Sequence, residues 1–326
     1  MAARLATVIV NYRTTDLVIA CLRSLRDETR GLPPANLALV DNGSGDGSAD
    51  RIAATIMAEG WSSWVSLLPL ADNRGFSAGN NAGIRLLLQS SEPAEYFLLL
   101  NPDTVVRKGA LEALLDFAER HPKAGIIGCR LEEPGGVPQR SAFRFHSAIG
   151  ELEQGLRLGI ASRMLSRWAV GLPQPESARR ADWVSGASML IRREVLDAIG
   201  FLDEGYFLYF EEVDFCLRAA RAGWECWHEP RSRVVHLGGQ STGVDLAASS
   251  KRLPGYLFES RRRYFVKNRG PLYALLADLA WLSGHLVWLL RSRVLGSTKR
   301  APPMLLRDFL RHSVLVRGFS LSGEIS

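Results

Sequence analysis

The first 130 residues alternate short apolar runs with amphipathic stretches. The apolar runs have the length of buried strands, and the amphipathic stretches repeat their apolar positions with a helical period. Strands joined through helices pair in parallel, because each crossover helix returns the chain to the starting edge of the sheet. The expected strands are 7–10, 37–40, 65–70 and 96–100, and the expected helices are 16–27, 49–59 and 79–89. The sequence therefore predicts an α/β fold with a Rossmann-like, mostly parallel sheet flanked by helices.

The pattern continues beyond residue 130 with one interruption. Residues 132–182 contain several glycines and prolines and no clear period, so we expect a mobile loop over a binding site. The remaining expected elements are a helix over 109–120, a strand over 125–130, a strand over 183–191, a helix over 211–222 and a strand over 232–236. We place a catalytic domain at 1–245 and a basic, helical C-terminal appendage at 246–326.

Positive charge is concentrated in the appendage. Residues 251–326 hold 14 Lys and Arg against 4 Asp and Glu, a net +10, whereas residues 1–250 hold 26 against 30, a net −4. A basic segment of this kind suits an anionic surface. Few aromatic residues are interleaved with its charges, which favours membrane phospholipid over nucleic acid as the partner.

Residues 271–290 form an apolar run inside this basic segment. As a helix it would reach roughly 30 Å, the thickness of a hydrocarbon core. Asp278 and His285 interrupt the run, and both flanks are basic, so loop charge gives no orientation. A helix in the membrane interface or packed on the catalytic domain is favoured over a span, which stays open.

The compartment follows from the N-terminus and the cysteines. The apolar stretch after Met1 is too short for a signal peptide and already resembles a first strand. The four cysteines form no Cys-x-x-Cys pair and are predicted to be reduced core thiols. We expect a cytoplasmic protein, peripheral on the inner face of the plasma membrane.

Two polar clusters carry the candidate chemistry. Asn101-Pro102-Asp103 ends an apolar strand, and oxygen ligands at such an end can hold a divalent ion against phosphate. The second cluster, Glu211-Glu212-Val213-Asp214, opens a predicted helix and can supply a base facing that metal.

These clusters and three further motifs occur in an order that resembles a known family. The further motifs are Val10-Asn11-Tyr12 with Val40-Asp41-Asn42-Gly43-Ser44, the loop 73–81, and His236 at the end of the strand 232–236. Over residues 6–240 the chain resembles a family 2 glycosyltransferase of the GT-A fold, in the rhamnosyltransferase-like branch that builds bacterial surface polysaccharides. The resemblance implies inverting, metal-dependent transfer of a sugar, with rhamnose a candidate. The donor would be a UDP- or dTDP-sugar, and the acceptor a hydroxyl of a glycan on a polyprenyl diphosphate.

The resemblance assigns residues to the donor. It implies that Tyr12 lies near the nucleotide base and that Asp41 accepts the pyrimidine N3–H, although an Asx turn is an alternative for Asp41. The remaining donor-binding residues that it implies are Asn73, Arg74, Gly75, Asn80, Asn101 and Asp103.

The resemblance also implies a metal site. Asp103 and His236 would ligate Mg²⁺ or Mn²⁺, with Asn101 a lesser, water-mediated contributor. The alternatives are a turn that caps the next helix for Asp103 and an ordinary hydrogen-bonded imidazole for His236.

The resemblance implies that the acidic motif at 211–214 supplies the catalytic base. Alignment on the trailing Leu-Arg pair assigns the role to Glu212, with Glu211 as an alternative and Asp214 as a weaker one, because Asp214 can pair with Arg218 one helical turn away. On the acceptor side the resemblance implies Trp183, Gly186 and Ala187.

Three other classes of protein are alternatives to a glycosyltransferase. A sugar-phosphate nucleotidyltransferase and a Rossmann dehydrogenase both need a glycine-rich loop after the first strand, and residues 11–15 contain no glycine. A non-catalytic glycan-binding or membrane scaffold on a degenerate transferase fold remains open from the sequence.

Overall fold

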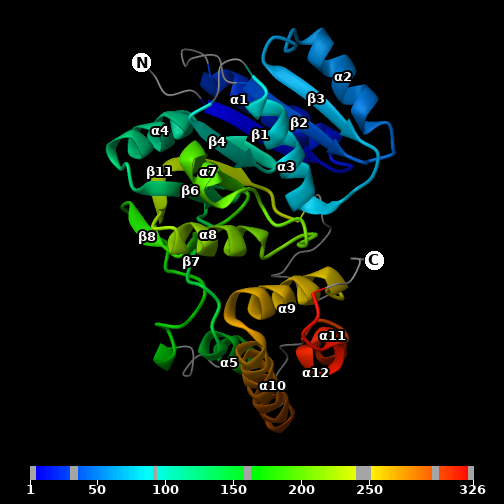
Figure 1. Cartoon of the computed structure of the whole chain (residues 1–326), viewed down its shortest axis with the longest axis vertical. Helices are drawn as coiled ribbons and strands as arrows, with labels where there is room; N and C mark the ends of the chain where they lie inside the picture. The colour runs from blue at the N-terminus through cyan, green and yellow to red at the C-terminus, as the bar shows by residue number, and fades with distance from the viewer. Residues whose placement is uncertain are drawn as a thin grey trace.

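A mixed β-sheet runs through the larger part of the molecule (Figure 1). The computed structural model of the chain describes residues 5–29, 36–90, 94–157, 163–239, 251–295 and 301–321. Within these residues the strand order is β3-β2-β1-β4-β10-β6-β11-β5, with β8 paired to β11. The strands are β1 (Leu5–Asn11), β2 (Asn36–Asn42), β3 (Val65–Leu70), β4 (Tyr96–Leu100), β5 (Thr104–Val106), β6 (Ala124–Glu132), β8 (Arg179–Ala181), β10 (Ser188–Arg192) and β11 (Glu225–His236).

The first four strands of this order pair in parallel, as predicted. The crossover helices are α1 (Thr15–Thr29), α2 (Ser48–Ala58) and α3 (Gly75–Leu88). Strand β10 is antiparallel to both β4 and β6, while β6 and β11 are again parallel. The predicted α/β fold with a mostly parallel sheet is therefore confirmed, and β10 is its main antiparallel insertion.

Apolar side chains fill both faces of the sheet. Helices α1, α2 and α4 (Ala110–Arg120) cover one face, where Leu22, Ile52 and Leu114 are buried. Helices α3, α7 (Arg193–Ile199) and α8 (Glu211–Arg221) cover the other. The second core continues into the C-terminal helices through Tyr264 and Phe265, so packing crosses the predicted domain boundary near residue 245, itself outside the described residues.

Two predicted strands have different bounds. The single strand expected over 183–191 is interrupted: β9 (Trp183–Val184) pairs with β7 (Ala142–Phe143), and β10 begins only at Ser188. Residues 185–187 leave the pairing because they line a cavity. Strand β11 begins seven residues before the predicted Ser232, since a register shift between Glu229 and Arg233, around Pro230, concealed its first half.

The prediction of a mobile loop over 132–182 is wrong for the residues that the structure describes. This segment forms β7, α5 (Ala148–Leu156) and β8, and Ser147 caps α5 by accepting a hydrogen bond from the Gly150 N–H. Helix α5 packs on α10 (Pro271–Val294) (Figure 1). A Cβ on Gly155 would lie 2.5 Å from the Trp281 carbonyl oxygen, and one on Gly284 would lie 2.6 Å from that of Leu152. Gly155 and Gly284 therefore permit close packing of the two helices.

The C-terminal part of the chain is helical, as predicted. It contains α9 (Gly255–Arg269), α10, α11 (Leu305–His312) and α12 (Val314–Arg317). Asp278 of α10 is ion-paired with Arg261 of α9 at 2.5 Å, and Arg261 also binds Glu151 of α5 at 2.8 Å. The carboxylate that interrupted the apolar run therefore belongs to a buried ion network that joins three helices.

Candidate active site

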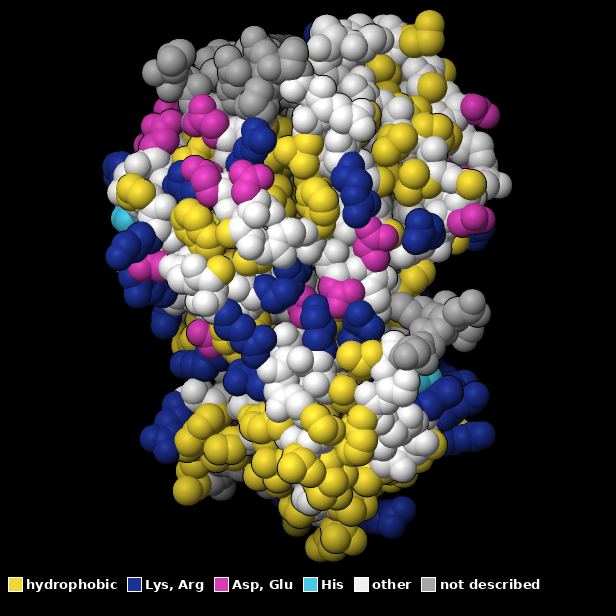
Figure 2. Space-filling model, in the orientation of Figure 1, with side chains coloured by type: hydrophobic (Ala, Val, Ile, Leu, Met, Phe, Trp, Pro, Cys, Tyr) yellow, Lys and Arg dark blue, Asp and Glu magenta, His cyan; other side chains and the backbone are white. Residues whose placement is uncertain are grey.

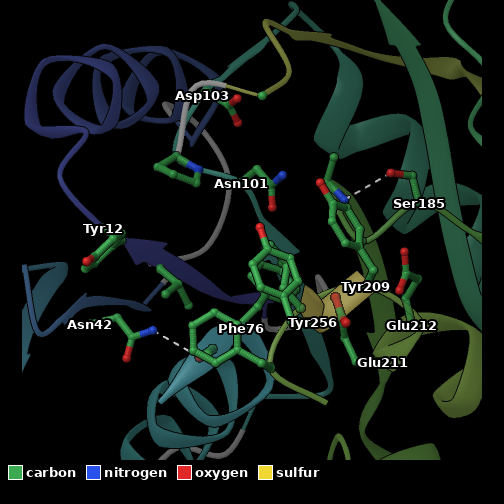
Figure 3. A pocket seen from close by; sticks show the side chains of 18 of the residues that line it. Tyr12, Asn42, Phe76, Asn101, Asp103, Ser185, Tyr209, Glu211, Glu212 and Tyr256 are labelled. Carbon is green, nitrogen blue, oxygen red and sulfur yellow. Dashed lines mark hydrogen bonds between the residues drawn. The ribbon is translucent and has the colours of Figure 1, made fainter. Parts of the chain in front are cut away.

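A cavity of about 430 Å³ opens at the carboxyl ends of β1, β2 and β4. Figure 3 shows Tyr12 and Asn42 on one side of it, Glu211 and Glu212 on the other, and Asn101 and Asp103 on the rim between them. Ten predicted residues line the cavity, namely Tyr12, Asn73, Gly75, Asn101, Asp103, Gly186, Ala187, Glu211, Glu212 and His236. The carboxyl ends of strands in an open α/β sheet are where such folds bind ligands. Five predicted residues, Asp41, Arg74, Asn80, Trp183 and Asp214, are absent from this lining.

Asp41 is buried beneath the strand ends. Its Oδ1 accepts hydrogen bonds from Asn11 Nδ2 at 2.7 Å and from Ser44 Oγ at 2.6 Å. These contacts fasten β1 to the turn after β2, in agreement with the alternative structural role. Its predicted bond to a pyrimidine stays a prediction. The next residue, Asn42, lines the cavity with a buried Oδ1 that accepts no hydrogen bond from the described residues.

The loop before α3 lies close to the segment that leads into Glu211 and Glu212. Gly75 has φ +90°, and a Cβ there would lie 2.4 Å from the Phe207 carbonyl oxygen. The Phe76 N–H donates to that same oxygen at 2.7 Å. Helix α3 therefore begins four residues before the predicted Gly79, because Phe207 supplies an acceptor for its first turn. Asn73 Oδ1 accepts from the Gly75 N–H at 2.9 Å and thereby holds the loop.

Two predicted residues of this loop point elsewhere. Arg74 faces Glu204 at 3.8 Å and is exposed, and Asn80 Nδ2 donates to the Phe76 carbonyl oxygen at 2.9 Å. Neither side chain contacts the cavity, so the loop itself offers backbone and Asn73 to a ligand there.

Asn101, Asp103 and His236 converge at the cavity rim. Pairing of β11 with β5 places His236 opposite Thr104. His236 Nε2 then lies 3.5 Å from Asp103 Oδ1 and 3.4 Å from Asn101 Nδ2. Burial lowers the pKa of His236, against the opposing effect of Asp103, which favours the neutral imidazole that binds metals.

The donors at this rim fit a divalent cation. Asp103 Oδ1 and Asn101 Oδ1 are buried and accept no hydrogen bond from the residues that the structure describes. No group of three His, Cys, Asp or Glu residues with metal-ligand geometry occurs among those residues. Asp103 and His236 lie together as two candidate ligands, and a cation held by them would need further oxygens from its ligand.

Glu211 and Glu212 begin α8 on the opposite wall. One carboxylate oxygen of each is buried without a hydrogen-bond partner among the described residues. Burial raises the pKa of Glu212 to about 7, while burial and the neighbouring Glu212 charge raise the pKa of Glu211 well above its usual range. A carboxylate whose pKa is raised toward neutral pH has the property of a general base.

The turn before α8 is strained. Tyr209 and Phe210 both have φ +68°, a left-handed conformation that costs on the order of 1 kcal/mol for each non-glycine residue. The turn delivers both glutamates to the cavity from the first turn of the helix, where the helix dipole favours negative charge. Strain at this point is consistent with a functional position.

Asp214 is not placed to act as a base. It is fully buried and ion-paired with Arg218 at 2.9 Å and with Lys267 at 2.8 Å, and it accepts a hydrogen bond from Asn268 at 2.8 Å. The predicted pairing with Arg218 is confirmed, and Asp214 does not line the cavity, so the structure gives its weaker base assignment no support.

Trp183 is also structural. It stacks on Phe143 with ring centroids 4.1 Å apart and donates from Nε1 to the Arg144 carbonyl oxygen at 2.8 Å. The prediction that it contacts an acceptor is therefore not supported, whereas Gly186 and Ala187 do line the cavity.

Comparison with known proteins decides the family. A family model described as "Glycosyltransferase like family 2" matches residues 3–253. The chain belongs to glycosyltransferase family 2. The resemblance inferred from the motifs is thereby confirmed, and the protein is an enzyme that transfers sugars.

Curated relatives of this family 2 glycosyltransferase include rhamnosyltransferases. The chain is 29% identical over 293 residues to an N-acetylglucosaminyl-diphospho-decaprenol L-rhamnosyltransferase of Mycobacterium tuberculosis, covering 86% of each chain. It is 25% identical over 164 residues to rhamnosyltransferase WbbL of Escherichia coli, covering 50% of this chain and 60% of that protein.

Solved structures confirm the GT-A fold. GalNAc-T7 with UDP, GalNAc and Mn²⁺ is similar with a TM-score of 0.60 at 14% identity, covering 95% of this chain and 58% of that one. Mannosyltransferase PcManGT from Pyrobaculum calidifontis, with GDP-Man and Mn²⁺, has a TM-score of 0.55 at 15% identity and covers 98% and 85%.

The glycosyltransferase cavity also contains residues that the sequence analysis missed. They are Asn42, Phe76, Ser185, Phe207, Leu208, Tyr209, Gly239 and Tyr256. The aromatic run before Glu211 was a signal for three of them. Tyr256 had no such signal, because it comes from α9, where it lies 5.5 Å from Phe207 and 6.2 Å from Tyr209 between ring centroids.

Proposed function

We propose that this enzyme transfers a sugar, with rhamnose the best-supported candidate, from a UDP- or dTDP-sugar to a hydroxyl group of a polyprenyl-diphosphate-linked glycan. The reaction would be an inverting step in bacterial cell-surface polysaccharide synthesis, at the inner face of the plasma membrane. The Mycobacterium tuberculosis relative supports the sugar and the lipid-linked acceptor, because the match extends over 86% of both chains.

One observation carries the proposal: a single cavity joins the Asp103–His236 rim to the unpaired Glu212 carboxylate on the facing wall. A glycosyl transfer needs a site for the leaving diphosphate and a base for the incoming hydroxyl on opposite sides of the anomeric carbon. The two walls supply those two functions.

The donor would lie against the strand ends. Tyr12, Asn42 and Asn73 line that side and would contact the nucleoside. Asp103 and His236, with Asn101 beside them, would hold Mg²⁺ or Mn²⁺. When bound, such an ion neutralises charge on the departing nucleotide diphosphate.

The acceptor would approach from the side of the cavity that Phe76, Phe207 and Tyr256 border. As the acceptor oxygen bonds to the anomeric carbon, its proton passes to the Glu212 carboxylate and the bond from the anomeric carbon to the phosphate oxygen breaks. Protonated Glu211 would remain uncharged beside it, because burial disfavours a second negative charge. Phe76, Phe207 and Tyr256 border this space and would limit access of water to the reacting carbon.

The test is transfer measured with a panel of UDP- and dTDP-sugars and a polyprenyl-diphosphate-linked acceptor, together with thermal shift of the enzyme by each donor. We expect a pyrimidine donor to raise the melting temperature more with Mn²⁺ than without it, because binding to the folded state stabilises it. Asp103→Ala should abolish this Mn²⁺-dependent increase.

Asp116→Ala is the matched control, because Asp116 lies on the outer face of α4 and is exposed. It should leave both assays unchanged. Wild-type enzyme that neither binds nor turns over any pyrimidine-nucleotide sugar would overturn the proposal.

A further inference from the structure

Helix α10 carries exposed apolar side chains along one face. Their exposed fractions run from 46% at Leu279 to 83% at Val294. They recur every three or four residues, which places them in one stripe along a helix. The outer stripe consists of Leu272, Leu276, Leu279, Leu286, Val287, Leu290 and Val294.

The opposite face of α10 is already covered by protein. Ala277, Trp281 and Trp288 are buried there, and the crossing of Gly155 with Gly284 brings α5 against the helix. A surface helix of a soluble domain has one apolar and one polar face. This helix is apolar on both, and protein covers only the inner one.

The surroundings of the outer stripe are apolar and basic. Exposed Leu315, Val316 and Phe319 follow on the segment beside α10, and they add to the apolar surface. Figure 2 shows this apolar end of the molecule as a continuous yellow area flanked by Lys and Arg. The exposed arginines of α9, α10 and α12 include Arg269, Arg291, Arg293 and Arg317.

A large exposed apolar area marks an interaction site. An apolar centre with an arginine border matches the boundary between acyl chains and anionic headgroups, where basic side chains gain from the negative surface potential. The +10 net charge of residues 251–326 adds to this attraction.

We propose that α10 docks this enzyme in the plane of an anionic bilayer, with the outer stripe at the acyl boundary and the arginines among the headgroups. Helix α10 is the one described helix long and apolar enough to cross a membrane. A span would expose its inner face to lipid, including Asp278, and would separate Asp278 from Arg261 and α10 from α5. Exposing such a buried charge to hydrocarbon is costly, so the helix lies flat.

The docked position serves the cavity directly. The inference rests on the proposed function in this respect, since a polyprenyl-linked acceptor is confined to the same bilayer. Helix α9 begins beside the cavity with Tyr256 and leads through Gly270 into α10. Docking through α10 would therefore tether the catalytic domain to the bilayer that carries the acceptor.

Flotation of the full chain with vesicles of phosphatidylcholine and phosphatidylglycerol tests the docking. The triple variant Leu276→Glu, Leu279→Glu, Leu290→Glu should lower the vesicle-bound fraction about tenfold or more, because it removes apolar contact and adds negative charge. Met57→Glu is the matched control, since Met57 is 76% exposed on α2 and should leave binding unchanged. Equal binding of wild type and triple variant would overturn the proposal. A wild type that dimerises through this face and does not bind vesicles would also overturn the proposal.

The orientation is tested with Arg269→Cys, just before α10, and Arg293→Cys, in its last turn. The four native cysteines are buried. In the flat arrangement a membrane-impermeant maleimide labels both positions in inverted inner-membrane vesicles and neither in intact spheroplasts. Labelling of one position from each side would show a span and overturn the proposal.

Thermal shift by the nucleotide sugar separates this inference from the proposed function. The triple variant should keep the wild-type shift, because none of its positions lines the cavity. If the enzyme transfers sugar but does not bind vesicles, only the docking proposal is overturned. If the protein binds vesicles but no donor, only the proposed transferase function is overturned.

Discussion

Buried carboxylates occur at the cavity and at the junction of α5, α8, α9 and α10, and their surroundings differ. In the cavity, Asp103, Glu211 and Glu212 each keep one buried oxygen without a hydrogen-bond partner among the described residues. At the junction, Asp214 and Asp278 are both ion-paired. An unpaired buried polar group costs free energy, whereas a paired one rigidifies the fold.

The pKa values of Glu212 in the cavity and of Asp203, a partly exposed carboxylate paired with residues of α9, move in opposite directions. Burial raises the pKa of Glu212 to about 7. Burial also opposes ionisation of Asp203, but hydrogen bonds from Lys267, the Gly205 N–H and Arg263 outweigh it and lower the pKa to about 2. We therefore expect the unpaired carboxylates to handle a proton or a cation, whereas the paired ones join helices.

The largest expected effect is on catalysis at the unpaired group. Glu212→Gln should lower kcat by about 10²- to 10⁴-fold, because it removes the proton acceptor while keeping the shape of the side chain. Donor binding, measured by thermal shift, should persist. Glu119→Gln on the exposed face of α4 is the matched control. If Glu212→Gln transfers sugar at the wild-type rate, another residue is the base, and the unpaired carboxylate has no catalytic role that separates it from the paired ones.

The next effect is on stability at the paired group. Asp278→Ala should lower the free energy of unfolding by roughly 3–5 kcal/mol, since it leaves Arg261 buried with one partner fewer. Urea denaturation measures this change. Asp116→Ala breaks an exposed pair with Arg120 and should change stability by less than about 0.5 kcal/mol. Similar losses in the two variants would contradict the structural role of the buried network.

The pH dependence sharpens the comparison at the cavity. The folded-state pKa of Glu212 lies above its ordinary value of 4.5, so wild-type stability is favoured at low pH and falls as pH rises toward about 7. Glu212→Gln lacks this loss and should gain stability relative to wild type between pH 5 and pH 8. Wild-type kcat/KM should rise through the same range, as the base ionises. A pH-independent difference in melting temperature would show that Glu212 is already ionised at pH 5.

The smallest effect is expected at Asp203, which is partly exposed. Its pKa is lowered to about 2 from 3.8, so its contribution to stability is present above about pH 4 and is lost as pH falls toward 2. Wild type should therefore exceed Asp203→Asn in melting temperature at pH 6, and the gap should narrow under acid conditions. A gap that widens toward pH 2 would contradict the paired environment.

Much of the fold was predictable because its signals are local. The alternation of apolar strands and amphipathic helices identified the parallel half of the sheet, and Asn101, Asp103 and Glu212 follow or begin predicted elements. Errors occurred where local signals conflict with distant contacts. Glycines and prolines suggested a loop over 132–182, yet α5 forms there and packs on α10, and Pro230 concealed a strand that bulges around it.

The sequence by itself determined the α/β architecture, the family and several residues that line the cavity from the strand ends, such as Tyr12 and Asp103, because periodicity and strand-end chemistry act over a few neighbouring residues. The pairing of Asp214 with Arg218 was also predictable, since the two are one helical turn apart. Only the tertiary structure decided that Lys267 and Asn268 bind Asp214 as well, while Glu212 faces an open cavity. The partners lie more than 50 residues away along the chain, and folding alone brings them together.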